Sequence, residues 1–260
     1  MARFEGKSVI ITGAGSGLGQ AAAVRLAQEG ANLVLVDMSE EGLAKTKELV
    51  AAEGGAGGVE VVTADVTKSE DVARYVDTAV QKFGAIDGFF NNAGIEGKQN
   101  LTEDFGDDEF AKVLAVNLTG VFAGMAAVLK QMHKQGSGSI VNTASVGGIR
   151  GVGNQSGYAA SKHGVVGLTR NSAREYGEHG ISINAIAPGA ILTAMVEGSL
   201  RQMGGENWEE VGKEFVSVNP MKRFGQPAEV AALVAFLLSD DSKFINGTVI
   251  PIDGGQHAMY

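Results

Sequence analysis

Residues 7–19 read Lys7-Ser8-Val9-Ile10-Ile11-Thr12-Gly13-Ala14-Gly15-Ser16-Gly17-Leu18-Gly19, and a helix-like stretch, residues 20–29, follows them. The first half is a short apolar run rich in β-branched residues, which is typical of a buried strand. Strand, glycine turn and helix N-terminus in this order form a cradle for phosphate, because glycines let the backbone approach closely and the helix dipole attracts negative charge. We therefore expect a dinucleotide to bind here. The residues expected to contact it are Gly13, Ser16, Gly17, Leu18 and Gly19.

A second strand-like run, residues 32–36, follows the helix and ends at Asp37. A carboxylate about 20 residues beyond the glycines is placed to accept hydrogen bonds from both hydroxyls of the adenosine ribose. It would repel a 2′-phosphate, and the next residue, Met38, brings no positive charge to this corner. We predict contacts from Asp37 and Met38 to NAD(H) rather than NADP(H). A plain turn-forming role is the alternative for Asp37.

Strand-like runs recur along the chain, with helix-length segments between most of them. They cover residues 7–12, 32–36, 59–64, 86–91, 139–143, 181–187 and 247–250. This alternation predicts a parallel sheet of about seven strands with helices on both faces. Right-handed crossovers then give a doubly wound, Rossmann-type α/β fold, with its ligand site at the carboxyl ends of the strands. We expect a single domain over residues 1–260, with the glycine-rich residues 53–58 as a loop within it.

Tyr158 and Lys162 stand four residues apart in a segment whose Ala-rich continuation to Tyr176 predicts a helix. Side chains at i and i+4 lie on one face of a helix, so the ammonium can sit beside the phenol. A neighbouring positive charge stabilises the phenolate and lowers the pKa of the tyrosine. The pair therefore predicts a general acid/base. An ordinary pair on a helix surface is the alternative.

Several motifs in this order resemble the short-chain dehydrogenase/reductase family, and the resemblance runs from about Lys7 to Gly255. They are Thr12-Gly13-x-x-x-Gly17-x-Gly19, Asp65, Asn91-Asn92-Ala93-Gly94, Asn117, Ser145 with Tyr158-x-x-x-Lys162, Pro188-Gly189 and Ile252-Asp253-Gly254-Gly255. Within the family, residues 86–100 and 143–151 look like those of cyclic-ketone reductases. The resemblance supports the same Rossmann-type fold.

The resemblance implies a role for each of four catalytic residues. Tyr158 would donate its proton to the substrate carbonyl oxygen in reduction, or take the hydroxyl proton in oxidation. Lys162 would lower the pKa of Tyr158 and hydrogen-bond the nicotinamide ribose. Ser145 would hydrogen-bond the same carbonyl oxygen, and Asn117 would hold a water that connects Lys162 to solvent. Two alternatives remain: Ser145 as a turn residue before Gly147, and Asn117 as a structural amide that braces its helix.

The resemblance also places the residues that follow the other strands around the cofactor. They are Asp65 and Val66 at the adenine, Asn92, Ala93 and Gly94 at the ribose, and Pro188, Gly189, Ile191 and Thr193 at the nicotinamide. Thr193 would hold the carboxamide and fix which face transfers hydride. A simple turn after a strand is the alternative for residues 91–94.

Residues 190–218 follow the nicotinamide contacts and carry the large apolar residues Met195, Met203, Trp208 and Phe215. We expect mobile helices here that form a lid over the reacting centre, since closure excludes water. Plain packing is the alternative for each of these side chains.

Polar residues after the fourth and fifth strands should lie near the same crevice. Glu96 could recognise an amine or a hydroxyl, or could pair with Arg150, and the residues alone do not decide between these roles. The residues expected to bind substrate are Ser145, Tyr158, Glu96, Gln155 and Met195.

Charge and composition exclude several classes of function. Lys and Arg total 21 and Asp and Glu total 30, so the net charge of -9 disfavours nucleic-acid binding. The absence of cysteine excludes disulfides and thiolate chemistry, and four scattered histidines give no metal-ligand spacing. The chain begins without an apolar signal core and contains no run of about 18 apolar residues, so we expect no membrane association and a cytoplasmic location.

We therefore expect an enzyme that transfers hydride reversibly between NAD(H) and a small cyclic ketone or its secondary alcohol. One alternative is a reductase of 3-oxoacyl thioesters, but those enzymes usually take NADPH and need a basic patch for an acidic carrier protein. Another is a catalytically silent NAD-binding module. The resemblance also implies a homotetramer, paired through the helices that follow Asn117 and Tyr158 and through the last helix and strand.

Overall fold

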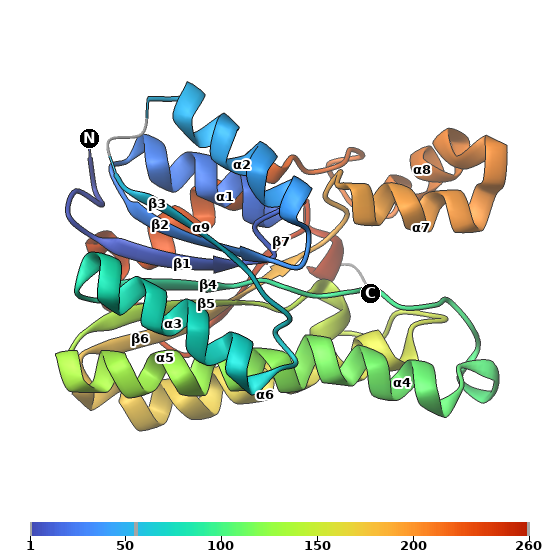
Figure 1. The fold of residues 1–260 in the computed structure, drawn as a ribbon. Coiled ribbons are helices and arrows are strands. Elements are labelled where there is room, and N and C mark those ends of the chain that lie inside the picture. Colours follow the sequence, from blue (N-terminus) through green and yellow to red (C-terminus); the bar gives the residue numbers. More distant parts are fainter. Residues whose placement is uncertain (1, 55–56, 259–260) are drawn as a thin grey trace.

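A parallel sheet runs through the middle of the molecule (Figure 1). The computed structural model describes residues 2–54 and 57–258. Within these ranges the sheet has seven strands in the order β3-β2-β1-β4-β5-β6-β7. Their bounds are β1 (Ser8–Thr12), β2 (Asn32–Asp37), β3 (Val59–Thr63), β4 (Gly88–Asn91), β5 (Gly138–Thr143), β6 (Ile181–Pro188) and β7 (Val249–Ile252). The chain builds outward from β1 in one direction and then, from β4, in the other, so the switch point lies between β1 and β4.

The predicted doubly wound α/β fold is confirmed, and each strand lies within a few residues of its predicted position. The last strand, expected at residues 247–250, begins later, at Val249. Part of the predicted loop at residues 53–58 lies outside the described residues. The strands could be predicted from the sequence because helices cover both faces of the sheet. In β6 every residue is buried, and such strands are near-continuous apolar runs.

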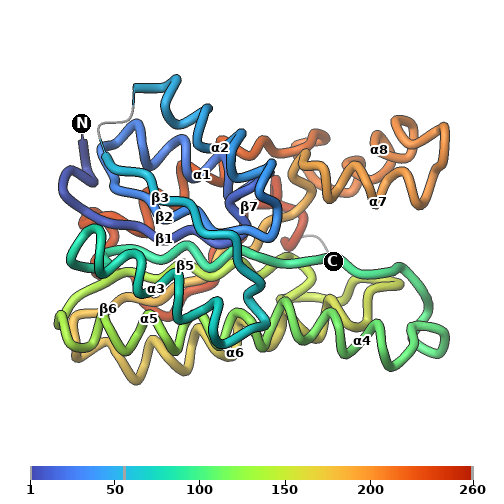
Figure 2. Tube along the Cα trace, viewed as in Figure 1, coloured from blue at the N-terminus to red at the C-terminus, as the bar shows by residue number. Residues whose placement is uncertain are grey.

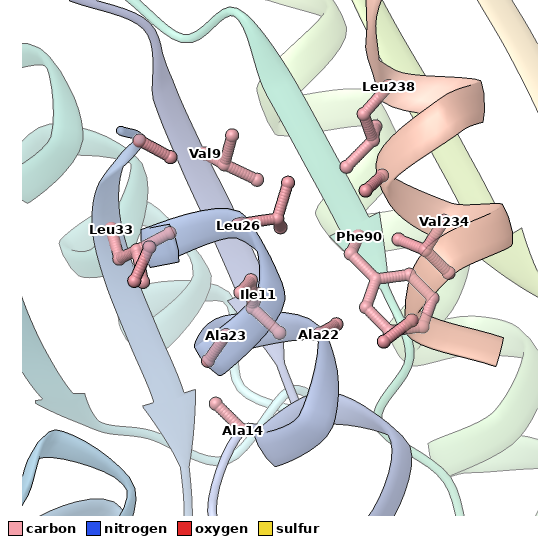
Figure 3. Packing of buried hydrophobic residues seen from close by; sticks show 14 of the residues in the cluster. Val9, Ile11, Ala14, Ala22, Ala23, Leu26, Leu33, Phe90, Val234 and Leu238 are labelled. Carbon is pink, nitrogen blue, oxygen red and sulfur yellow. The ribbon is translucent and has the colours of Figure 1, made fainter. Parts of the chain in front are cut away.

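Helices form a layer on each face of the sheet (Figure 1). One layer holds α1 (Gly17–Gln28), α2 (Glu40–Ala52) and α9 (Pro227–Leu238), and the other holds α3 (Ser69–Phe83), α5 (Val121–Gln135) and α6 (Ser156–Tyr176). Side chains of β1 alternate between the two layers, as the pleat of a strand requires. Val9 and Ile11 join the first core with residues of α1 and α9 (Figure 3), whereas Ile10 joins the second.

Helix α4 (Asp107–Leu114) continues into α5 through a π-helical segment, η2 (Ala115–Gly120). Because η2 joins the two helices, residues 107–135 become the one described helix with the length and composition to cross a membrane. Its most apolar window has a mean hydropathy of 1.7 and is 44% buried within the protein. The prediction of no membrane-length apolar segment did not foresee this continuous helix. It packs against α3 and α6 as part of the second layer.

Two further helices, α7 (Ala194–Gly204) and α8 (Trp208–Ser217), pack on each other as a hairpin. Figure 2 shows the α7–α8 hairpin standing beyond the end of the sheet, apart from the layered body. The helices expected in residues 190–218 are therefore present. The short 3-10 segments are η1 (Thr102–Asp104), η3 (Val146–Gly148), η4 (Gly177–His179), η5 (Gly205–Asn207), η6 (Asp240–Ser242) and η7 (Gln256–Ala258).

Candidate active site

A cavity of about 310 Å³ opens at the carboxyl ends of the strands, beside the switch point between β1 and β4. Ligands of open α/β sheets bind at such a position. Most of the residues predicted to bind cofactor or substrate line this cavity. They are Gly13, Ser16, Gly17, Leu18, Asp37, Asn92, Gly94, Ser145, Tyr158, Lys162, Pro188, Gly189, Ile191, Thr193 and Met195. A second cavity, of about 390 Å³, lies at the amino ends of the strands, and none of the predicted site residues lines it.

The glycine turn between β1 and α1 depends on glycine for its shape. Gly13 and Gly17 have φ angles of 67° and 52°, which side chains of other residues disfavour. A Cβ atom on Gly19 would lie 2.0 Å from the carbonyl oxygen of Gly13. Gly19 is therefore absent from the cavity lining because it packs against the turn and allows it to close.

The N-terminus of α1 suits an anionic ligand. Its N-cap, Ser16, makes no side-chain hydrogen bond to the first turn, whereas Ser39, the N-cap of α2, accepts one from the amide of Gly42 at 3.0 Å. The first amides of a helix have no partner within the helix and need one from outside. The cavity lies against the uncapped end of α1, so its residues fit the pyrophosphate of a dinucleotide.

Asp37 ends β2 and takes part in two local hydrogen bonds. Its Oδ2 accepts from the amide of Gly15 at 2.9 Å, and its Oδ1 accepts from the amide of Ser39 at 3.0 Å. The turn-forming role is thus present, but it does not exclude ligand binding, because a carboxylate has about four acceptor positions. Among the residues described as lining the cavity, Lys162 is the sole cation. Met38 is 70% exposed and lies outside the lining.

Tyr158 and Lys162 both project from α6 into the cavity. Lys162 is 3% exposed, which excludes the helix-surface interpretation. Its Nζ donates to the carbonyl oxygen of Thr143 at 2.8 Å and lies 5.6 Å from the centre of the Tyr158 ring. Burial lowers the pKa of Lys162 to about 8.

The pKa of Tyr158 moves in the direction opposite to the one predicted. Burial raises it, the hydroxyl of Ser145 lowers it by less, and the carboxylate of Glu96 raises it further. The expectation that Lys162 lowers this pKa overlooked how fully the phenol is removed from water. The phenol therefore holds its proton more tightly than an exposed tyrosine does.

Ser145 follows β5 and caps the short helix η3. Its Oγ accepts from the amide of Gly147 at 3.1 Å, so the predicted alternative, a turn residue, describes part of its role. A hydroxyl that accepts one hydrogen bond still has its own proton to donate. Because Ser145 also lines the cavity, that proton is available to a bound oxygen atom.

Asn117 lies within η2 and is fully buried. Its Oδ1 accepts from the amide of Ile95 at 2.8 Å, and its Nδ2 donates to the carbonyl oxygen of Ile95 at 2.7 Å and to Ser161 Oγ at 3.3 Å. These contacts brace the loop after β4, as the structural alternative requires. A Cβ atom on Gly94 would meet both Asn117 Oδ1, at 3.1 Å, and Lys162 Nζ, at 3.5 Å, so both side chains border the same glycine.

The segment after β4 is more than a turn, because it joins the ends of three strands. The amides of Asn92 and Ala93 donate to Thr12 Oγ1 in β1 at 2.9 and 3.1 Å, and Thr143 Oγ1 in β5 donates to Asn92 Oδ1 at 3.1 Å. Asn92 and Gly94 line the cavity, whereas Ala93 does not. The backbone here is fixed by hydrogen bonds before any ligand binds.

Asn117 lies outside the cavity lining, and so do five other residues expected near the cofactor or the substrate. Asp65 Oδ1 accepts from the amide and the hydroxyl of Thr67 at 2.9 and 2.7 Å, and Val66 packs against Gly120. Glu96 and Gln155 hydrogen-bond to each other. Arg150 donates to the carbonyl oxygen of Gln256 at 3.2 Å, so the possible pair of Glu96 with Arg150 is not formed.

Some residues of the lining were not predicted, and each lies within two residues of a predicted one along the chain. They are Ile95, Thr143, Ala144, Ala194 and Val196. Their positions after β4, at the end of β5 and at the start of α7 were the available signal. Four of these five residues are apolar, and none has a chemical group that would single it out.

A family model described as enoyl-(acyl carrier protein) reductase matches residues 13–257. The levodione reductase of Leifsonia aquatica is 61% identical over 258 residues, which cover 99% of this chain and 97% of that protein. The chain belongs to the short-chain dehydrogenase/reductase family. The predicted family and the predicted enzyme class, an oxidoreductase, are thereby confirmed.

Two further relatives are less similar to this chain than the levodione reductase is. The cyclohexanol dehydrogenase of Acinetobacter sp. (strain SE19) is 42% identical, over 97% of this chain and 95% of that protein. A 3-oxoacyl-[acyl-carrier-protein] reductase of Thermotoga maritima is also 42% identical, over 97% and 98%.

Solved structures of family members share the fold. The crystal structure of a levodione reductase, 61% identical, superposes with a TM-score of 0.97 over 99% of this chain and 100% of that chain. A xylitol dehydrogenase with bound NAD+, 39% identical, gives a TM-score of 0.92 over 97% and 99%.

Proposed function

We propose that this oxidoreductase transfers hydride reversibly between NAD(H) and a small cyclic ketone or its secondary alcohol. The observation that carries the proposal is the meeting of Ser145, Tyr158 and Lys162 in one cavity with the glycine turn and Asp37. The levodione reductase and the cyclohexanol dehydrogenase among the relatives support a cyclic substrate. The bound nicotinamide supplies or accepts the hydride.

The protein's own part in the reaction is to move one proton and hold one oxygen atom. In reduction, the Tyr158 hydroxyl donates its proton to the substrate oxygen, and the Ser145 hydroxyl donates a hydrogen bond to the same atom. Burial raises the pKa of Tyr158, which keeps the proton in place for reduction at neutral pH. Lys162 and Asn117 complete the proposed catalytic group: Lys162 at the nicotinamide ribose, and Asn117 through a water.

The choice of NAD(H) over NADP(H) rests on Asp37. Its carboxylate lines the cavity at the end of β2, and the described lining contains no arginine that could receive a 2′-phosphate. The family member solved with bound NAD+ supports the same choice. Gly19, Met38, Asp65, Val66 and Ala93 remain proposed cofactor contacts, and Glu96 and Gln155 remain proposed substrate contacts.

Three experiments test the proposal. Measurement of kcat/KM with NADH and with NADPH decides the cofactor, and a preference for NADPH would refute the role given to Asp37. Screening NADH oxidation across cyclic diketones, bicyclic amino ketones and acyl thioesters decides the substrate class.

The variant Tyr158→Phe should lose turnover and keep NADH binding. An unchanged turnover would contradict the proposed acid/base.

A reductase of 3-oxoacyl thioesters is the second candidate. A 42% identical reductase of this kind favours it. Asp37 and the net charge of -9 argue against it, because such enzymes usually use NADPH and a basic surface for the acidic carrier protein. Faster turnover of an acyl thioester than of any cyclic ketone would establish it. A cavity that holds Ser145, Tyr158 and Lys162 together gives no support to a silent NAD-binding module.

The proposal includes a cytoplasmic homotetramer. Phe122 on α5 is 53% exposed, and Phe244, near β7, is fully exposed. Large apolar side chains on the two expected contact faces suit burial between subunits. Light scattering would measure the mass in solution, and a monodisperse monomer would contradict the proposed assembly. Fractionation of cells tests the location.

A further inference from the structure

Few polar contacts tie the α7–α8 hairpin to the rest of the protein. Figures 1 and 2 show the hairpin beyond the layered body. Among the described residues, one side chain of residues 194–217 hydrogen-bonds outside the hairpin: Ser199 Oγ on α7 donates to Glu96 Oε2, in the loop after β4. The other side-chain contacts across the hairpin bounds come from its flanks, where Lys222 Nζ donates to the carbonyl oxygen of Ser217 and Thr193 Oγ1 accepts from the amide of Val196. Ser199 is 8% exposed, so this contact is sheltered from water. This contact is therefore the buried polar tie between the hairpin and the loop after β4.

Glu96 is held in turn by neighbours on the body of the protein. Its Oε1 accepts from Gln99 Nε2 at 3.2 Å and from Gln155 Nε2. Gln155 is the N-cap of α6, the helix that carries Tyr158 and Lys162. Each of these partners in the described structure is neutral, and a carboxylate can only accept, so the three donors converge on one negative charge.

The contact also reaches the wall of the cavity. Ser199 Oγ is within 3.2 Å of the carbonyl oxygen of Met195, one helical turn earlier on α7. Met195 and Val196 line the cavity. A displacement of α7 that separates Ser199 from Glu96 therefore also moves part of the cavity wall.

We propose that Ser199 and Glu96 form a latch, which holds the α7–α8 hairpin closed over the reacting centre, and that Gln155 fixes the latch to the catalytic helix. Glu96 and Ser199 act as positioning residues in this role. The link to catalysis rests on the proposed function, whereas the closure itself does not. Breaking the latch opens the hairpin and weakens the hold on substrate.

Hydrogen exchange of residues 194–217 tests the latch directly, with Ser199→Ala as the variant. Alanine is smaller than serine and favours helix, so the variant keeps α7 intact. The matched control is Ser217→Ala, the same change on the exposed end of α8, where the structure gives the hydroxyl no partner. We expect exchange in residues 194–217 to be roughly tenfold faster in Ser199→Ala, the loss of a hydrogen bond to a charged group, and unchanged in Ser217→Ala.

Kinetics separates a latch from a general structural role. Ser199→Ala should raise KM for the ketone several-fold and leave kcat and the dissociation constant of NADH close to the original values. Exchange in Ser199→Ala equal to that of the original protein, with or without NADH, would overturn the latch. Absence of NADH binding or of turnover in the original protein would instead overturn the proposed function and leave the exchange result interpretable.

Discussion

The cofactor end of the cavity and the α7–α8 hairpin are built in opposite ways. At the ends of β1, β4 and β5, Thr12, Asn92 and Thr143 are joined by several hydrogen bonds, and the glycine turn leaves no room for a side chain. One side chain of the hairpin, Ser199, hydrogen-bonds to the described body. One cavity thus combines a cofactor end fixed by many hydrogen bonds with a wall that few polar contacts hold.

The largest effect on NADH affinity is expected at the glycine turn, where Gly19 has no space for a side chain. In Gly19→Ala the new Cβ atom would stand 2.0 Å from the carbonyl oxygen of Gly13, so the turn must open. We expect NADH affinity to fall roughly 100-fold or more, since a misplaced phosphate cradle loses several backbone contacts at once. Titration of protein fluorescence with NADH measures it. Gly198→Ala, on α7 with open space around the position, is the control and should bind normally.

A matched pair of methionines compares the stability of the two regions. Met132 on α5 is fully buried, and Met203 on α7 is 47% exposed. Met132→Ala should lower the free energy of unfolding by about 2–5 kcal/mol because it leaves a cavity. Met203→Ala should change it by no more than about 0.5 kcal/mol. Chemical denaturation measures both, and equal losses would contradict the proposed difference between body and hairpin.

Removal of the carboxylate of Asp37 should have an intermediate effect. Asp37→Ala loses its proposed hydrogen bonds to the adenosine ribose and also frees the amide of Gly15. We expect kcat/KM for NADH to fall roughly 10- to 100-fold, as for the loss of hydrogen bonds to a charged group. The value for NADPH should fall less or rise, because the repulsion of a 2′-phosphate is removed. An equal fall for both cofactors would show that Asp37 acts through the turn alone.

The smallest effect expected is a shift in pH dependence when the charge of the latch is removed. Burial and the Glu96 carboxylate both raise the pKa of Tyr158, so Glu96→Gln should lower it. Alcohol oxidation needs the phenolate, and the rising limb of kcat/KM against pH should therefore move to lower pH. Ser199→Ala keeps the charge and should leave that limb in place. A limb that moves to higher pH, or not at all, would show that Glu96 does not act on Tyr158.

The fold and the cofactor end of the cavity could be predicted from sequence because the signals for both are local. A parallel strand covered on both faces is an apolar run, and the glycine turn, Asp37 and the Tyr158 to Lys162 spacing are each contained within a short stretch. Even the alternatives were informative: Asp37 and Ser145 each take part in a turn and also line the cavity.

The features that could not be predicted depend on contacts between residues far apart in sequence, on burial or on local helix geometry. The partners Glu96 and Ser199 lie 103 residues apart, and no motif pairs them. The direction of the Tyr158 pKa shift depends on how much water reaches the phenol, which spacing along a helix does not reveal. The π-helical turn at Asn117 was likewise unforeseen, because a single wider turn is too short to establish a periodicity of its own.

Trp208 is the only tryptophan of the chain, and it lies at the start of α8 with Arg201 stacked 4.5 Å from its ring. All indole emission of this protein therefore originates on the hairpin. Reduced nicotinamide absorbs at the wavelengths where indole emits, so energy transfer between the two reports their separation. Trp208 therefore serves as an intrinsic fluorescence donor that reports the distance from the hairpin to the cofactor. The rate of opening can be measured in solution without any attached dye.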